Sequence, residues 1–369
     1  MKNITVDELK KCLSSSLLVD IRSAEAYGHG YIDNAVSFPE PVNIEELVCF
    51  IEKIKPEKVV VYCTRGLKSE EVVNILTQYD INAYNLGGGY DEWLIKHYED
   101  PYCEENLYYS RQMVLPELGI AGQNKLRNSK VMIIGAGALG TSALMYLAAA
   151  GVGTIGIVEG DTVDITNLHR QILYSIEDVG SKKVEAAKRR LESGNPYINI
   201  ISYDTFATPD NISELIKDYD FVIDATDRIE TKFLINDACV IKKIPFCHAG
   251  ILGFYGQVMS WCPGDNPCYR CIFEDIPEDY IPNCAESGII GAVSGIIGSV
   301  QALEAIKYIT KIGSMLVGRM LRFDGLTMNT RVIKLPKKND NCKVCGNKAT
   351  ISDVKNNKDN YKVKQRCSI

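Results

Sequence analysis

A glycine-rich turn between two apolar runs constrains the fold of this chain more than any other feature. Residues 131–134 (VMII) read as a buried strand, and the turn GAGALG follows at 135–140. The apolar run to about Ala150 reads as a helix, and residues 155–158 (IGIV) read as a second strand. A glycine turn between a strand and a helix lets the backbone approach a phosphate, and the helix N-terminus supplies free N–H groups. The pattern therefore predicts a parallel α/β fold that binds a nucleotide.

Glu159 is a second sequence feature that indicates a nucleotide-binding site. It follows the second predicted strand, 19 residues after Gly140. An acidic side chain at this point can accept hydrogen bonds from ribose hydroxyls. The spacing supports a nucleotide but does not identify which one.

The composition narrows the class of protein. A chain of 369 residues with 46% hydrophobic residues can build two or more domains with large cores. The net charge of −6 gives no reason to expect nucleic acid as a partner. The first residues, MKNITVDELKK, have no apolar segment, so we expect no secretion signal. Residues 131–158 carry no charge, but their strand-turn-helix-strand rhythm argues against a membrane helix. We expect a cytoplasmic protein.

Residues 1–97 read as a small α/β domain built around a cysteine. The apolar runs 17–22 (LLVDIR) and 58–63 (KVVVYC) read as strands, and 69–78 reads as an amphipathic helix. Cys63 ends its strand, and the loop CTRGLKS leads into that helix. Backbone N–H groups, the helix dipole and nearby basic side chains favour the thiolate there. On position alone, a buried cysteine without a chemical role is the alternative.

Three longer motifs of this region are VDIRSAEAYGHGYIDNAVSFP, VVYCTRGLKS and NLGGGYDEW. They resemble the rhodanese family over nearly its whole length. The resemblance implies that Cys63 carries sulfur as a persulfide and that residues 64–69 form its anion-binding loop. Lys68 stands where the family usually has Arg, which keeps the charge but loses a planar two-pronged donor. The upstream sulfur donor therefore stays undefined.

A second resemblance covers the chain from Tyr108 to about Gly346, after a polar stretch at 98–107 that reads as a linker. The motifs of this part, in chain order, are YYSRQMVLPELGIAGQNKL, GAGALG, NLHRQIL, DVGSKKVEAA, YDFVIDATD, FLINDACV, GQV, PCYRCIF, NCAESGIIG, GSVQALEAIKY and CKVCG. They resemble the ubiquitin-activating-enzyme superfamily, in the branch of bacterial adenylyltransferases that serve molybdopterin and thiamine sulfur carriers. The resemblance implies a Rossmann-like ATP-binding domain with a mixed sheet.

This second resemblance assigns residues to a site for ATP and Mg²⁺. Glu159 would take the ribose, Asp227 would hold Mg²⁺, and Arg111 would reach the ATP of the partner subunit in a homodimer. Adenylation joins two anions, so such a site must supply positive charge. The other implied contacts are the turn residues Gly135, Gly137, Ala138 (usually Gly) and Gly140, and the phosphate ligands Asn167, Arg170 and Lys183.

Two Cys-x-x-Cys pairs, Cys268/Cys271 and Cys342/Cys345, have the spacing at which two thiolates bind one tetrahedral Zn²⁺. Two such pairs in one chain predict a four-cysteine zinc site. The resemblance implies a structural zinc here. Because the protein would fill all four positions, none would remain open for catalysis.

Cys284 and the C-terminal stretch complete the sequence-based predictions. Cys284 precedes a glycine-rich helical run, and the resemblance implies that it forms a covalent thioester or acyl disulfide with the carrier. Residues 347–369 are polar, rich in Lys and Asn, and read as a disordered tail.

Together the two resemblances imply ATP-dependent adenylation of the Gly-Gly C-terminus of a ubiquitin-like sulfur-carrier protein, followed by sulfur transfer from Cys63. The expected partners are that carrier, a cysteine desulfurase or other sulfur donor, and a second copy of the chain. In relatives with both parts the rhodanese domain usually follows the adenylating domain, whereas here it comes first. The alternatives are a nicotinamide- or flavin-dependent oxidoreductase, an adenylating enzyme acting on a peptide or RNA, and a non-catalytic scaffold.

Overall fold

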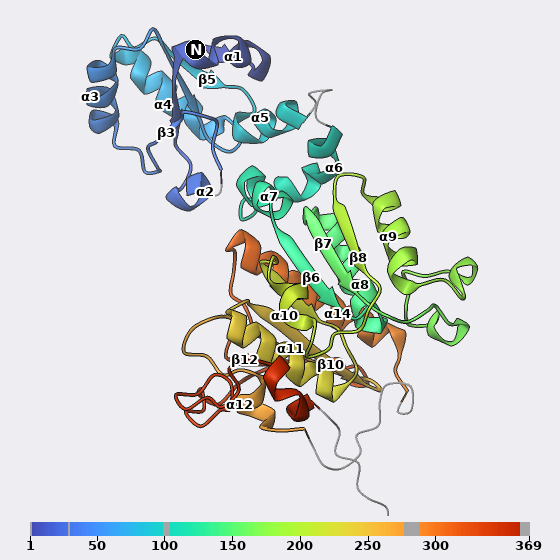
Figure 1. Cartoon of the computed structure of the whole chain (residues 1–369). Coiled ribbons are helices and arrows are strands. Elements are labelled where there is room, and N and C mark those ends of the chain that lie inside the picture. The colour runs from blue at the N-terminus through green and yellow to red at the C-terminus, as the bar shows by residue number, and fades with distance from the viewer. Residues whose placement is uncertain (1, 29, 99–103, 277–287, 362–369) are drawn as a thin grey trace, which may run out of the picture. The chain divides into compact units, whose positions relative to one another are not determined.

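The computed structural model describes residues 2–28, 30–98, 104–276 and 288–361. By internal contacts the chain divides into two units, residues 1–124 and 125–369. Each unit has its own sheet and its own apolar core. The chain is therefore described below as two separate bodies (Figure 1).

The first unit is built on a five-stranded parallel sheet in the order β1-β5-β4-β2-β3. Its central strand β4 reads KVVVY, and four of these five residues are buried, as expected of a strand covered on both faces. The strands are β1 (Asn3–Ile4), β2 (Ser16–Asp20), β3 (Val36–Ser37), β4 (Lys58–Tyr62) and β5 (Ala83–Leu86). The helices are α1 (Val6–Cys12), α2 (Ala24–Gly28), α3 (Ile44–Ile54), α4 (Leu67–Gln78), α5 (Gly89–Tyr98), α6 (Glu104–Met113) and α7 (Gly119–Arg127), the last crossing the division.

The packing boundary differs from the boundary that the motifs predict. Part of the expected linker, from Glu104 onward, is helical and belongs to α6, while residues 99–103 lie outside the described residues. Tyr109 and Met113 on α6 are buried in the core of the first unit. These apolar anchors explain why residues 108–124 group with the first unit, although their motifs resemble the adenylating family.

The second unit is built on an eight-stranded mixed sheet in the order β13-β12-β11-β10-β9-β6-β7-β8. Strands β10, β9, β6, β7 and β8 run parallel, and β11, β12 and β13 continue the sheet antiparallel. The strands are β6 (Lys130–Ile134), β7 (Thr154–Val158), β8 (Asn199–Tyr203), β9 (Phe221–Asp224), β10 (Phe246–Leu252), β11 (Tyr255–Trp261), β12 (Arg319–Asp324) and β13 (Asn329–Lys334).

Helices cover this sheet and complete the predicted Rossmann-like architecture. Helix α14 packs against α8 and against β9, β10 and β11. The strand order reverses at β6, because β7 lies on one side of it and β9 on the other, and ligands bind at such points. The helices are α8 (Ala138–Ala150), α9 (Lys183–Gly194), α10 (Ile212–Ile216), α11 (Ile229–Lys242), α12 (Tyr269–Phe273) and α14 (Gly291–Thr310), with 3₁₀ turns η2 (Ile165–Asn167), η3 (Ile176–Asp178) and η4 (Lys355–Tyr361).

The predicted disordered tail is wrong for residues 347–361. Ile351 is buried, Val354 and Tyr361 belong to the core of the second unit, and the Tyr361 hydroxyl donates to Asp237 Oδ2 at 2.9 Å. A few well-placed apolar side chains and one buried acceptor therefore order a segment whose average composition is polar. Residues 362–369 lie outside the described residues.

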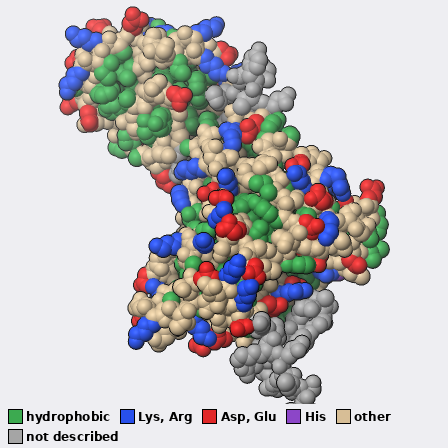
Figure 2. All heavy atoms as spheres, in the orientation of Figure 1, with side chains coloured by type: hydrophobic (Ala, Val, Ile, Leu, Met, Phe, Trp, Pro, Cys, Tyr) green, Lys and Arg blue, Asp and Glu red, His purple; other side chains and the backbone are tan. Residues whose placement is uncertain are grey.

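The face of the molecule shown in Figure 2 is mixed in charge. On this face, Lys and Arg side chains are interspersed with Asp and Glu. The helices in the described parts of the chain are each too short or too polar to span a bilayer.

Candidate functional site

The Cys63 sulfur lies in a cradle at the end of β4. Cys63 is buried, and its Sγ accepts a hydrogen bond from the Gly66 N–H at 3.1 Å. Gly66 has φ +81°, and a Cβ on it would lie 2.8 Å from the Leu86 carbonyl oxygen, so the turn requires glycine here. Helix α4 begins at the next residue, which aims the positive end of its dipole at the sulfur.

Polar groups around this sulfur favour its thiolate form. The Ser69 hydroxyl lies 3.4 Å from Cys63 Sγ and 2.7 Å from Asn85 Oδ1. Burial alone would raise the pKa of Cys63, but hydrogen bonds from the Ser69 hydroxyl and from backbone N–H groups of the loop lower it below its usual value. A thiolate is the nucleophilic form of cysteine, so this loop can hold a reactive sulfur.

The two basic side chains of the loop are exposed and paired with acids. Lys68 pairs with Glu40, and Arg65 Nε lies 3.7 Å from Asp91 Oδ2. Exposed ion pairs of this kind contribute little to stability, so both cations can exchange partners at low cost.

The predicted glycine turn of the second unit connects β6 to α8. A Cβ on Gly140 would lie 1.9 Å from the Gly135 carbonyl oxygen, so the first turn of α8 packs directly on the end of β6. Gly137 caps α8, and Ala138 is its first residue. The turn therefore brings a helix N-terminus to the carboxyl end of the central strands, which is the arrangement that binds phosphate.

Glu159 holds this turn in place. Its Oε2 accepts from the Ala136 N–H at 3.0 Å, and its Oε1 accepts from the N–H groups of Gly160 and Asp161 at 2.9 and 3.0 Å. The buried Lys183 ammonium lies 3.8 Å from Glu159 Oε2 and 3.3 Å from Asp161 Oδ2. Glu159 thus positions the glycine turn through these hydrogen bonds. The sequence spacing predicted only a contact with ribose and could not indicate this positioning role.

A cavity of about 480 Å³ opens beside this turn. Four cationic and three acidic side chains line it, which suits a polyanionic ligand that arrives with a divalent cation. Arg170 donates from Nη1 to the Thr166 carbonyl oxygen, and Asn167 Oδ1 accepts from Gln171 Nε2. The predicted residues that line the cavity are Gly135, Gly137, Ala138, Glu159, Asn167, Arg170, Lys183 and Asp227.

Several side chains on the cavity wall were not predicted as site residues, among them Phe206, Arg228 and Lys232. Phe206 is half exposed, and the Arg228 guanidinium lies 6.0 Å from the centre of its ring. Lys232 lies on the first turn of α11 and is almost fully buried. A lysine five residues after Asp227 was the available signal for Lys232, but nothing in the local pattern separates it from a solvated lysine.

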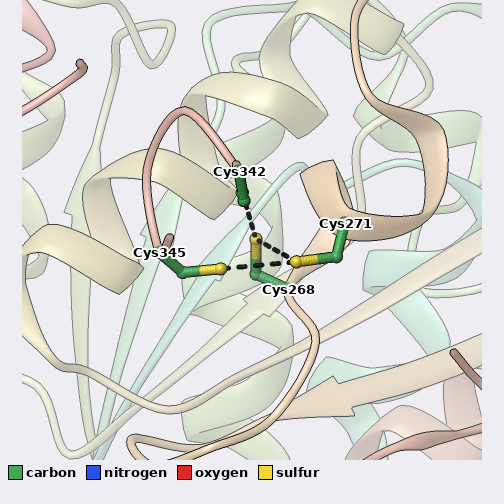
Figure 3. Close-up of side chains that lie close together, drawn as sticks. All are labelled: Cys268, Cys271, Cys342 and Cys345. Carbon is green, nitrogen blue, oxygen red and sulfur yellow. Dashed lines mark hydrogen bonds between the residues drawn. The ribbon is translucent and has the colours of Figure 1, made fainter. Parts of the chain in front are cut away.

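The two Cys-x-x-Cys pairs converge as predicted (Figure 3). Sulfur–sulfur distances are 3.9 Å for Cys268 to Cys271, 3.6 Å for Cys268 to Cys342 and 3.4 Å for Cys271 to Cys345. Thiolates about 2.3 Å from one tetrahedral Zn²⁺ lie about 3.8 Å apart, so this donor set fits zinc. The first pair flanks the start of α12, and the second lies in the loop after β13. Zinc here would join two segments about 70 residues apart in the chain.

Among the predicted contacts from the glycine turn, Gly140 does not line the cavity, because it packs against the Gly135 carbonyl oxygen. Arg111 is exposed on α6 in the first unit. Cys284 lies outside the described residues.

Comparison with known proteins agrees with both resemblances. The chain matches the Rhodanese-like domain over residues 5–96 and the ThiF family over residues 109–344. It is 42% identical over 247 residues to the adenylyltransferase and sulfurtransferase MOCS3 of Aedes aegypti, covering 67% of this chain and 56% of that protein. It is 41% identical over 257 residues to the sulfur carrier protein adenylyltransferase of Thermus thermophilus, covering 68% of this chain and 94% of that protein.

The fold agrees with a solved structure as well. The crystal structure of E. coli MccB with ATP superimposes with a TM-score of 0.57 at 24% identity, covering 67% of this chain and 74% of that one. The chain spans about half the length of the MOCS3 relatives that it matches. These matches do not favour the oxidoreductase alternative. The chain belongs to the ThiF family and carries a rhodanese-like domain ahead of its ThiF portion.

Proposed function

We propose that this chain adenylates the C-terminal Gly-Gly carboxylate of a ubiquitin-like sulfur-carrier protein and then converts it to a thiocarboxylate. The observation that carries the proposal is the presence in one chain of a cation-lined cavity at a glycine turn and a thiolate-stabilising loop around Cys63. The MOCS3 relative is named an adenylyltransferase and sulfurtransferase, which supports this pairing of activities, and the Thermus relative is named a sulfur carrier protein adenylyltransferase, which supports the first of them.

The adenylation step uses the charges around the cavity. The carrier carboxylate attacks the α-phosphorus of ATP, an acyl–phosphate bond forms, and pyrophosphate leaves. Arg170 and Lys183 would balance the negative charge that accumulates on the phosphates. Asp227 is exposed and lines the cavity, so its carboxylate could hold a Mg²⁺ ion, which would supply further positive charge there.

A second cavity supports a protein substrate. It has a volume of about 620 Å³, lies over β11, β12 and β13, and shares Gly250 and Ile251 with the nucleotide cavity. Exposed Leu252, Tyr255 and Ile333 line it. A carrier docked there could extend its flexible C-terminus across Gly250 toward the α-phosphate.

Sulfur transfer would start from a Cys63 persulfide loaded by a cysteine desulfurase or another donor. Its terminal sulfur attacks the acyl carbon, AMP leaves, and an acyl disulfide links the carrier to Cys63. A second thiol, from Cys284 or from solution, then attacks Cys63 Sγ. The S–S bond breaks, the carrier thiocarboxylate leaves, and a new disulfide takes up the oxidation.

The assembly and the compartment belong to the same proposal. Helices α8 and α14 pack together and expose Met145, Tyr146, Ile296 and Leu303, an apolar face that suits a homodimer in which Arg111 of the partner subunit completes the site. The ten cysteines of the described residues are not joined in disulfides, which suits the cytoplasm.

The test is the intact mass of a candidate Gly-Gly carrier after incubation with the enzyme, ATP, Mg²⁺ and a sulfur source. We expect the carrier to gain the mass difference between sulfur and oxygen with wild type and to gain nothing with Cys63→Ala. The matched control is Cys49→Ala, which removes an exposed cysteine on α3 of the same unit.

Two other outcomes would contradict the proposal. AMP formation without the mass gain in wild type would leave an adenylating enzyme whose rhodanese-like unit has another role. No AMP with any of several carriers would favour a peptide or RNA acceptor.

A further inference from the structure

Three buried ionisable side chains meet at the wall of the nucleotide cavity. Asp224 ends β9, His248 lies in β10 and Lys232 lies on α11; they are 1%, 2% and 7% exposed. His248 Nδ1 is 2.6 Å and Lys232 Nζ is 3.4 Å from Asp224 Oδ2. Buried charges of this kind are costly to place, and they persist when they are paired and hydrogen-bonded.

The protonation of this group follows from its contacts. Burial alone would raise the pKa of Asp224, but the Lys232 ammonium and the hydrogen bond to His248 hold it well below its usual range. Burial, assisted by Lys232, lowers the pKa of His248 despite the neighbouring carboxylate. His248 is therefore neutral and donates its Nδ1–H to Asp224. The three side chains together form an ion pair between Asp224 and Lys232, with a neutral imidazole hydrogen-bonded to the carboxylate.

The other oxygen of Asp224 holds the loop that carries Asp227. Asp224 Oδ1 accepts from the Thr226 backbone N–H at 3.0 Å and from the Thr226 hydroxyl at 2.7 Å. Thr226 directly precedes Asp227, and both line the cavity. The Asp224 carboxylate thus has two roles. Its Oδ1 fixes the loop at Thr226, and its Oδ2 holds the Lys232 ammonium and the His248 imidazole.

The Lys232 ammonium has capacity for one further acceptor. Two of its hydrogen bonds go to Asp224 Oδ2 and to the Ala249 carbonyl oxygen, the latter at 2.7 Å. An ammonium has three N–H donors, and among the described residues no third acceptor contacts Nζ. Because Lys232 also lines the cavity, a bound anion can supply that acceptor.

We propose that Lys232 is a further phosphate-binding residue of the nucleotide cavity and that Asp224 and His248 are its positioning residues. The proposal rests on the proposed function, because it takes a nucleoside triphosphate as the ligand. The ion pair fixes a cation at the wall before the nucleotide arrives, so little rotamer freedom is lost on binding. The same carboxylate aligns the Asp227 loop with that cation.

The test compares ATP with adenosine, which lacks phosphates, in direct binding measurements by calorimetry. We expect Lys232→Gln to weaken ATP binding by about tenfold or more, the size of one lost charge-assisted hydrogen bond, and to leave adenosine binding unchanged. Lys232→Arg keeps the charge and should restore ATP binding to within about threefold of wild type.

A control variant is needed to separate a loss of ATP binding from a loss of folding. Lys232→Gln leaves a buried carboxylate without its cation, so the double variant Lys232→Gln with Asp224→Asn, which removes both charges, is measured in parallel. Melting temperatures establish that each variant is folded. The double variant should also lose ATP affinity and keep adenosine affinity.

Equal losses of ATP and adenosine binding would reduce Lys232 to a structural residue, and unchanged ATP binding in a folded variant would remove it from the phosphate site. Either result overturns the inference without touching the proposed function. Failure of wild type to form AMP with any carrier would instead overturn the proposed function.

Discussion

Cys63 and Gly135 stand at equivalent places in two sheets, each after a strand that is paired in parallel on both sides. Each follows a buried strand, and each begins a turn that ends at a helix N-terminus. In the first unit the turn closes around the sulfur of the chain itself, and the Gly66 N–H is bonded to it. In the second unit the turn carries no reactive side chain and opens onto a cavity of about 480 Å³.

The comparison indicates that the backbone of such a turn favours an anion in both units. The side chains in and around the turn determine whether that anion is bound covalently or by charge. A cysteine in the turn allows a covalent bond to sulfur. Glycines in the turn leave space, and the cationic side chains that line the cavity, among them Arg170, Lys183 and Lys232, would then hold the anion.

The two units also differ in how they are stabilised, and metal removal should expose the difference most strongly. If zinc joins Cys268, Cys271, Cys342 and Cys345, a metal present at about 1,000 times its Kd adds about 4 kcal/mol to the stability of the second unit. We expect chelation to lower the unfolding temperature of the second unit and to leave that of the first unchanged, as seen by calorimetry of the whole chain.

The control for chelation is Cys342→Ser with a zinc assay. Wild type should release one zinc ion per chain to a colorimetric chelator, and the variant should release less. Equal unfolding temperatures with and without chelator would show that the cluster does not stabilise the second unit.

Gly140→Ala should damage the second turn itself. The added methyl would lie 1.9 Å from a backbone oxygen, so the helix must shift, at a cost of about 3 kcal/mol. We expect a lower unfolding temperature of the second unit and weaker ATP binding. Gly194→Ala is the matched control, because a Cβ there meets nothing within 4 Å and favours the helix. A Gly140→Ala variant as stable as wild type would contradict the close packing of this turn.

Ser69→Ala should change the first turn more mildly. Loss of the hydroxyl removes the hydrogen bond that most lowers the pKa of Cys63, so that pKa should rise. At a pH below both pKa values, the fraction of Cys63 present as thiolate falls about tenfold for each unit by which its pKa rises. At a pH well above both values, the thiol is ionised in wild type and in the variant. Alkylation of Cys63 should therefore slow near neutral pH and recover at high pH.

Peptide mass spectrometry can follow this alkylation, with exposed Cys49 as the internal reference. An unchanged pH profile for Cys63 would show that the loop backbone alone sets its reactivity.

Much of the site could be predicted because its residues lie in local motifs. The turn at 135–140 and the two cysteine pairs depend on short spacings, and the structure brings the predicted cavity residues together. The group of Asp224, Lys232 and His248 could not be predicted in this way. His248 lies opposite Asp224 only through the register of β9 and β10, and Lys232 reaches both from α11.

The segment 347–361 shows the same limit. Its composition is polar, and its order depends on Val354 and Tyr361, which pack in a core built from residues far away in the chain. An average of hydrophobicity over a sequence window does not detect a few buried side chains. Their burial depends on packing against residues that are distant in the sequence.

The contact between Tyr361 and Asp237 has a consequence for synthesis of the chain. Asp237 and Arg270 form a buried ion pair, and the Tyr361 hydroxyl binds the same carboxylate from 124 residues further on. At about 5–20 residues per second, the ribosome needs about 6–25 s to make that interval. The second unit therefore lacks this buried contact until after its described strands have been made. The residues of the first unit, 1–124, are made before that interval begins.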